Sequence, residues 1–180
     1  MTKNRQTKET PVAALAGNPN VGKSTIFNAL TGMRQHTGNW PGKTVSLAQG
    51  VCMYKGEEIR LVDLPGTYAL VSKSQEETLA AGFISGGEAD CVIAVCDATS
   101  LERSLILALQ VMELTDRVIV CVNLMDEAQK QGIEIDLAAL SFELGVPVVA
   151  ASASREEGMG ELLEQLRRIL DGFEAPRPRR

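Results

Sequence analysis

Apolar residues gather in short unbroken runs along most of the chain, and stretches with apolar residues at helical spacing lie between them. Short continuous apolar runs are typical of strands buried on both faces. The runs predict strands over 12–16, 90–96, 117–122 and 146–150, and the spaced stretches predict helices over 24–30, 76–85, 101–114, 127–131, 137–144 and 160–170. This alternation indicates a mostly parallel sheet with helices on both faces.

Residues 33–75 depart from this alternation. Residues 33–43 are polar and rich in glycine, which predicts a long functional loop. Residues 44–54 and 57–62 predict two strands joined by a tight turn at Lys55-Gly56, and a second loop spans 67–75. The first loop holds His36, which we expect to be solvated rather than a catalytic base. It also holds Trp40, for which docking of a partner and packing of the loop both stay open.

Composition bounds the class of protein. With 180 residues, of which 44% are hydrophobic, the chain suits one globular domain. We expect a tail at 1–10, the domain at 11–172, and a basic Pro/Arg tail or linker at 173–180. The net charge of −5 argues against broad nucleic-acid binding. No apolar run reaches the roughly 18 residues of a membrane span, and the polar start does not resemble a signal peptide, so a cytoplasmic location is expected.

The segment after the first predicted strand fits the pattern G-x-x-x-x-G-K-[ST]. A strand, a glycine-rich loop and a helix in this order point backbone N–H groups at one phosphate, and the helix dipole adds positive potential there. We expect Lys23 to reach the β- and γ-phosphates and the Ser24 hydroxyl to bind Mg²⁺. The expected nucleotide-binding residues here are Gly17, Asn18, Pro19, Asn20, Val21, Gly22, Lys23, Ser24 and Thr25.

A second candidate segment follows the strand at 57–62 and consists of Asp63, Leu64, Pro65 and Gly66. The Asp63 carboxylate can hold Mg²⁺ directly or through water. Gly66 has no side chain, so its N–H can approach a γ-phosphate. By itself D-x-x-G also describes an ordinary turn, but its place after the phosphate-loop lysine favours a nucleotide site.

Asn123, Leu124, Met125 and Asp126 follow another buried strand. A carboxylate here can accept hydrogen bonds from N1–H and the 2-amino group of guanine, whereas adenine has no donor at either position. Asn123 is expected to tie this loop to the phosphate loop. Asp126 as a helix N-cap is the alternative interpretation.

Two weaker candidates complete the set. Ser152, Ala153 and Ser154 follow the last strand, where the Ala153 N–H can bind guanine O6 or the segment can simply cap the last helix. The Thr44 hydroxyl can complete the Mg²⁺ shell when a γ-phosphate orders its loop, or Thr44 can merely start a strand. The nucleotide-binding prediction around it covers Gly42, Lys43, Thr44, Val45 and Ser46.

With these five segments in order, the chain resembles the Era-like branch of regulatory GTPases, and more narrowly the ferrous iron transport protein B family. The likeness runs from about Val12 to Leu170. It is carried by Gly17–Gly32, Gly38-Asn39-Trp40-Pro41-Gly42, Asp63-Leu64-Pro65-Gly66-Thr67-Tyr68 and Asp97–Arg103. The resemblance implies a Ras-like P-loop NTPase fold with a mostly parallel six-stranded sheet, one antiparallel edge strand and helices on both faces.

The resemblance also implies a mechanism, with Asn20, Lys23, Thr44 and Gly66 as the catalytic residues. Ser24, Thr44 and Asp63 would bind Mg²⁺, and Asn20 would bind an activating K⁺ completed by the backbone around Gly38–Trp40. Such a cation adds positive charge where the transition state gains negative charge. Thr67 stands where many signalling GTPases have Gln, so main-chain groups of 33–45 are expected to position water, and turnover is expected to be slow. Lys43, Ser46 and Ala151 depart from the family pattern.

In that family the domain binds GTP and GDP at the cytosolic N-terminus of a membrane protein and regulates ferrous iron transport. A helical domain and a membrane permease domain follow it there, and neither is present in this chain. The chain is therefore expected to be either a piece of such a protein or a free-standing relative. The alternatives are a GTP/GDP sensor with negligible hydrolysis and an Era-like ribosomal GTPase, which would call for an RNA-binding module.

Overall fold

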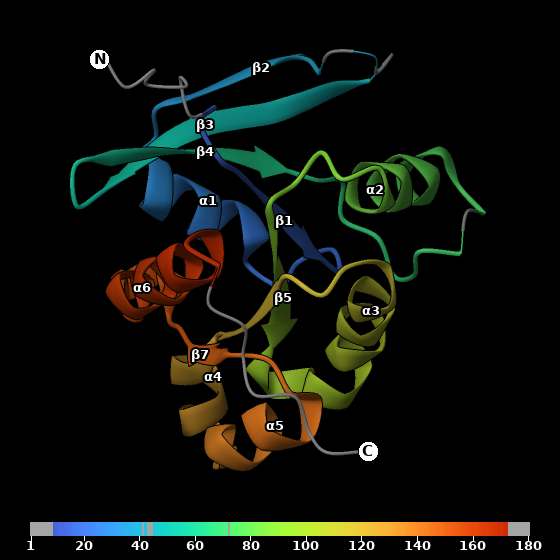
Figure 1. The fold of residues 1–180 in the computed structure, drawn as a ribbon. Helices are drawn as coiled ribbons and strands as arrows, with labels where there is room; N and C mark the ends of the chain where they lie inside the picture. The colour runs from blue at the N-terminus through green and yellow to red at the C-terminus, as the bar shows by residue number, and fades with distance from the viewer. Residues whose placement is uncertain (1–8, 41, 43–44, 72, 173–180) are drawn as a thin grey trace.

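The computed structural model of the protein describes residues 9–40, 42, 45–71 and 73–172. Its centre is one seven-stranded sheet with the strand order β2-β3-β4-β1-β5-β6-β7 (Figure 1). β1, β4, β5, β6 and β7 pair in parallel, while β3 pairs antiparallel with both β2 and β4. The strands are β1 Val12–Gly17, β2 Gln35–Asn39, β3 Ser46–Tyr54, β4 Glu57–Asp63, β5 Cys91–Asp97, β6 Val118–Asn123 and β7 Val148–Ala150.

Helices cover both faces of this sheet, as the alternating pattern predicts. α1 and α6 lie on one face, and α2 and α3 lie on the other (Figure 1). The α-helices are α1 Lys23–Thr31, α2 Gln75–Ser85, α3 Leu101–Leu114, α4 Met125–Lys130, α5 Leu137–Leu144 and α6 Met159–Leu170; short 3-10 turns span Ala98–Ser100 and Ala153–Arg155. The helices expected at 101–114 and 137–144 are confirmed to the residue.

The predicted fold class is confirmed, but the strand count is not. The sheet has seven strands rather than six, because residues 35–39 form β2 inside the stretch that the sequence predicts as loop. The antiparallel strand is β3, and β2 outside it is the edge. β2 reads Gln-His-Thr-Gly-Asn and is largely exposed, so it carries no hydrophobic pattern. Its backbone pairing with β3 holds it in place.

Two hydrophobic cores lie on the two faces of the sheet. Every residue of β1, β5 and β6 is buried except Asp97 at the end of β5, which explains their continuous apolar runs. Alternate side chains enter opposite cores: Ala14 and Val120 face α2 and α3, whereas Leu15 and Ile119 face α1 and α6. The predicted hairpin turn is confirmed at Lys55 and Gly56, whose φ angles of 49° and 79° match a type I′ turn.

Trp40 belongs to the core on the face covered by α2 and α3. Its side chain is 8% exposed, and its ring lies edge-on to Phe83 of α2 with centroids 5.1 Å apart. The Arg60 guanidinium lies over the same ring at 5.9 Å. Of the two interpretations that the sequence left open, the structure therefore supports packing of the loop, and His36 on β2 is exposed to solvent. No helix in the described part of the chain is both long and apolar enough to span a bilayer.

Candidate functional site

The predicted site residues converge on one edge of the sheet. Gly17, Asp63 and Asn123 end the parallel strands β1, β4 and β6, and residues 151–154 follow β7. Because parallel strands place their carboxyl ends at a common edge, four loops far apart in sequence meet there. This edge is the usual ligand position in open α/β sheets.

The phosphate loop runs from the end of β1 to the start of α1. Gly22 precedes the helix with φ 81°, and Asn20 takes φ 66°, a left-handed conformation that is uncommon outside glycine. Ser24 and Thr25 in the first helical turn are exposed. A Cβ on Gly22 would lie 2.2 Å from Asn123 Nδ2, so glycine is required here for space as well as for backbone conformation.

Lys23 crosses from this loop to the end of β4. Its ammonium group forms an ion pair with Asp63 Oδ1 and donates a 2.7 Å hydrogen bond to the Leu64 carbonyl. The two side chains are 9% and 14% exposed. The predicted phosphate ligand and the predicted Mg²⁺ ligand are thus adjacent, and each neutralises the other.

The segment after Asp63 lies along the phosphate loop. Leu64 N donates to Leu15 O at 3.0 Å, and Thr67 N donates to Gly17 O at 3.2 Å. A Cβ on Gly66 would meet the Pro19 backbone at 3.3 Å, so absence of a side chain permits this approach. Thr67 is buried, whereas Gly66 is exposed and faces solvent at the site.

Asn123 joins three loops. Its Nδ2 donates to the Val21 carbonyl at 3.0 Å, which confirms the predicted tie to the phosphate loop. Its Oδ1 accepts the Ala153 N–H at 3.0 Å. A buried amide needs an acceptor, and Asn123, 1% exposed, supplies it from within the chain. Guanine O6 would have to replace this acceptor, so binding of O6 by the Ala153 N–H stays a prediction.

Asp126 lies in the first turn of α4, which follows β6 at the same edge. The Asp126 backbone N–H donates to Ser152 Oγ at 3.1 Å, and the Met125 N–H donates to Ala151 O at 3.1 Å. Leu124 takes φ 64° at the start of α4, a left-handed conformation that is costly for this side chain. Of the five non-glycine residues with positive φ in the described part of the chain, Asn20 and Leu124 lie at the site.

Part of the predicted site is not brought together. Lys43 and Thr44 lie outside the described residues. Gly42 and Val45 are exposed, and the Ser46 hydroxyl donates to Asn39 Oδ1 at 3.1 Å. Gly38 and Asn39, expected beside Asn20, lie in β2, three strands from β1 and therefore about 14 Å away at the usual strand spacing. These two residues pair with β3, and their expected role in binding K⁺ stays a prediction.

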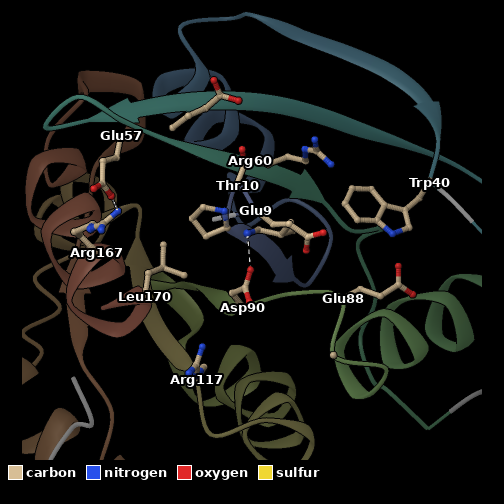
Figure 2. A pocket seen from close by; sticks show the side chains of 14 residues that line it. Glu9, Thr10, Trp40, Glu57, Arg60, Glu88, Asp90, Arg117, Arg167 and Leu170 are labelled. Carbon is tan, nitrogen blue, oxygen red and sulfur yellow. Dashed lines mark hydrogen bonds and ion pairs between the residues drawn. The ribbon is translucent and has the colours of Figure 1, made fainter. Parts of the chain in front are cut away.

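A wide cavity of about 860 Å³ lies at the opposite edge of the sheet. Figure 2 shows it between Trp40, Arg60, Asp90 and Arg167, where Asp90 Oδ2 accepts the Val12 N–H at 2.8 Å and Arg167 pairs with Glu57. Its lining comes from β4, from the segments at the amino ends of β1, β5 and β6, from Trp40 and from α6, and it mixes carboxylates with arginines. None of the described residues that are predicted to bind nucleotide lines it.

The four cysteines carry no chemistry at the site. All are buried and unpaired, and burial raises the pKa of Cys52 to about 11 and the pKa of Cys91, Cys96 and Cys121 to about 12. Protonated thiols are poor nucleophiles and poor ligands. They act as small apolar side chains.

Two contacts at the site involve partners that the sequence analysis missed. The Leu64 carbonyl accepts from Lys23, and the Arg155 Nε lies 3.5 Å from Asp126 Oδ2. A backbone carbonyl carries no sequence signal. Arg155 lies one position beyond the Ser-Ala-Ser segment, and this nearness is the one signal that could have found it.

A phosphate loop between a strand and a helix, with a carboxylate on the next strand and an Asn-x-x-Asp loop on a third, defines the class of P-loop G domains with a Ras-like fold. Residues 11–166 match the family model for ferrous iron transport protein B. The chain therefore belongs to the ferrous iron transport protein B family and corresponds to its G domain.

Known relatives agree with this membership. The chain is 44% identical over 165 residues to the Fe(2+) transporter FeoB of Escherichia coli K12, covering 89% of this chain and 21% of the relative. It is 47% identical over 152 residues to FeoB of Salmonella typhimurium, covering 82% of this chain and 20% of the relative. The chain thus spans about a fifth of the length of the curated relatives it matches.

Solved structures show the same fold. The G domain of T. maritima FeoB matches with a TM-score of 0.82 and 45% identity, covering 89% of this chain and 98% of that one. The G domain from Methanococcus jannaschii matches with a TM-score of 0.79 and 42% identity, covering 91% and 99%. The cytosolic domain of T. maritima FeoB in a GDP form matches with a TM-score of 0.88 and 43% identity, covering 95% and 67%.

Proposed function

We propose that this chain binds GTP and GDP with Mg²⁺ and hydrolyses GTP slowly, as a switch on the cytosolic face of a ferrous iron transporter. This proposal rests on one observation, which is that Lys23, Asp63 and the Asn123–Asp126 loop lie together at one edge of the sheet. One end of this edge offers cationic and N–H groups for phosphates, and the other offers a carboxylate for guanine. The T. maritima relative is described in GDP and GMPPNP forms, which supports this nucleotide class.

The donors at the phosphate end suit Mg²⁺. Ser24 offers an exposed hydroxyl and Asp63 a carboxylate, and hard oxygen donors are the ligands this ion prefers. Ser24, Asp63 and Thr44 would hold it, and the bound ion would neutralise charge on the phosphates. Lys23 would leave Asp63 and the Leu64 carbonyl and bind the phosphates, so that GTP replaces an internal contact.

K⁺ stimulation is the finer part of the proposal and depends on Asn20. Its left-handed backbone lies within the phosphate loop, its side chain is exposed, and an amide oxygen suits a monovalent cation. Completion of that site by the backbone of residues 38–40 would require Gly38 and Asn39 to leave their pairing with β3. We therefore expect K⁺ binding only with nucleotide present.

The second candidate is a GTP/GDP sensor that scarcely hydrolyses. Thr67 favours it, because the residue after Gly66 is buried and its N–H is bound to Gly17 O. No side chain at this position reaches an attacking water. Hydrolysis then depends on backbone groups or on a partner.

Phosphate release from GTP, measured with Mg²⁺ in K⁺ and in Na⁺ buffer, separates the two candidates. Faster release in K⁺, lost in Asn20→Ala while GDP still binds, supports the switch. Binding without release in either buffer supports the sensor. Absence of guanine nucleotide binding would refute both.

Base recognition has its own test. Asp126→Asn replaces an acceptor by a donor, so the preference is expected to move from GTP to XTP. The alternative role of Asp126 as a mere helix cap predicts no change in preference, because asparagine also caps helices.

A further inference from the structure

The base-reading carboxylate already has a cationic neighbour. Arg155 Nε lies 3.5 Å from Asp126 Oδ2. The Asp126 side chain is 11% exposed and the Arg155 side chain 53% exposed, so one partner is nearly buried and the other reaches it from solvent. Removing a carboxylate from water is costly without a counter-charge, and Arg155 supplies that charge.

The backbone around Arg155 keeps this contact in place. Arg155 N donates to Ser152 O at 2.9 Å, and Ser152 and Glu157 pair in a short bridge with bonds of 3.1 and 3.2 Å. Ser152 Oγ in turn accepts the Asp126 N–H. The same small loop therefore contacts both members of the ion pair.

Guanine needs both carboxylate oxygens of Asp126, and the Arg155 guanidinium lies against one of them, Oδ2. The guanine N1–H and 2-amino group would donate to this carboxylate, and the carboxylate cannot give the base and the guanidinium its best geometry at once. We propose that Arg155 is an internal competitor for the guanine-reading carboxylate, so that a guanine base binds Asp126 only by displacing it. This inference rests on the proposed function.

The size of the effect follows from the exposure of Arg155. Ion pairs with one exposed partner contribute about 0.2–1 kcal/mol, which corresponds to at most about a fivefold change in affinity. Arg155→Ala is therefore expected to lower the Kd for GDP about two- to fivefold at low salt. Arg155→Lys keeps the charge and should restore most of the wild-type Kd.

The experiment is calorimetric titration of the whole chain with GDP and Mg²⁺ at about 50 mM and at about 1 M salt. Since screening at high salt shortens the reach of exposed charges to about 3 Å, the ratio of wild-type to Arg155→Ala Kd should approach one there. Arg117→Ala is the matched control: it removes the same charge before β6, at the opposite edge of the sheet (Figure 2). It should leave the GDP Kd unchanged.

A double variant tests whether Arg155 acts through the Asp126 carboxylate, because a purely structural role of Arg155 would not depend on that carboxylate. In Asp126→Asn, which lacks the carboxylate charge, adding Arg155→Ala should leave XDP affinity unchanged. Three outcomes overturn the inference: weaker GDP binding in Arg155→Ala, an effect equal to that of Arg117→Ala, or the same gain with and without the Asp126 carboxylate. If the wild type binds no guanine nucleotide, the proposed function falls as well, which distinguishes the two failures.

Discussion

Asn123→Ala should destabilise the chain even without nucleotide. The Asn123 side chain is 1% exposed and serves two loops at once, donating to Val21 O and accepting from Ala153 N, each at 3.0 Å. Alanine cannot replace either bond. The substitution therefore leaves a buried carbonyl and a buried N–H without partners on two different loops.

The expected cost follows from these two groups. Each buried polar group that loses its partner costs about 1–3 kcal/mol. We therefore expect the free energy of unfolding to fall by about 2–6 kcal/mol, a large share of the roughly 5–15 kcal/mol of a typical domain. At about 2–4 °C per kcal/mol for this size, Tm should fall by about 4–24 °C.

Urea unfolding of the nucleotide-free protein, followed by circular dichroism, measures this loss. The control is Asn39→Ala, whose Oδ1 accepts an exposed hydrogen bond from Ser46 and which should cost about 0.5 kcal/mol or less. Equal unfolding energies for the two variants would refute the reasoning. Asn123→Asp should be no better than alanine, because it buries a charge beside the Val21 carbonyl.

Three further predictions follow from the same geometry. Gly22→Ala should abolish GDP binding in titrations, since its Cβ would lie 2.2 Å from Asn123 Nδ2; retained affinity would contradict the close contact. Gly66→Ala, whose Cβ would meet the Pro19 backbone at 3.3 Å, should keep GDP binding but lower phosphate release from GTP at least tenfold; an unchanged rate would exclude the role of Gly66. At pH 8 the four cysteines should resist a thiol reagent until urea is added, and fast labelling of the folded protein would contradict the raised pKa values. The free energy of unfolding should fall as the pH rises above 9, because the folded state keeps thiol protons that the unfolded state loses.

The sequence predicts the fold well where burial leaves a pattern. β1, β5 and β6 are buried on both faces and appear as unbroken apolar runs, and α3 shows clear helical spacing. β2 leaves no such pattern, because backbone pairing rather than burial fixes an exposed strand of polar residues. The sequence therefore predicts six strands instead of seven, and it does not predict that Gly38 and Asn39 belong to a strand.

The site divides in a similar way. Motif spacing predicts that Lys23, Asp63 and Asn123 meet, because it reflects which strand each residue follows. Which partner each polar atom takes depends on side-chain reach across the loops, and spacing does not encode it. The sequence therefore predicted neither that Asn123 accepts the Ala153 N–H nor that Arg155 lies beside Asp126.

The packing of Trp40 has a consequence for observing the protein. It is the one tryptophan in the sequence, it lies against Phe83 in the core, and it precedes Thr44 by four residues. A single indole ring in an apolar setting emits at shorter wavelength than one in water. Any rearrangement of residues 38–45 that moves this ring into water would therefore shift the intrinsic fluorescence to longer wavelength. Such a rearrangement can be followed by tryptophan fluorescence without an added dye.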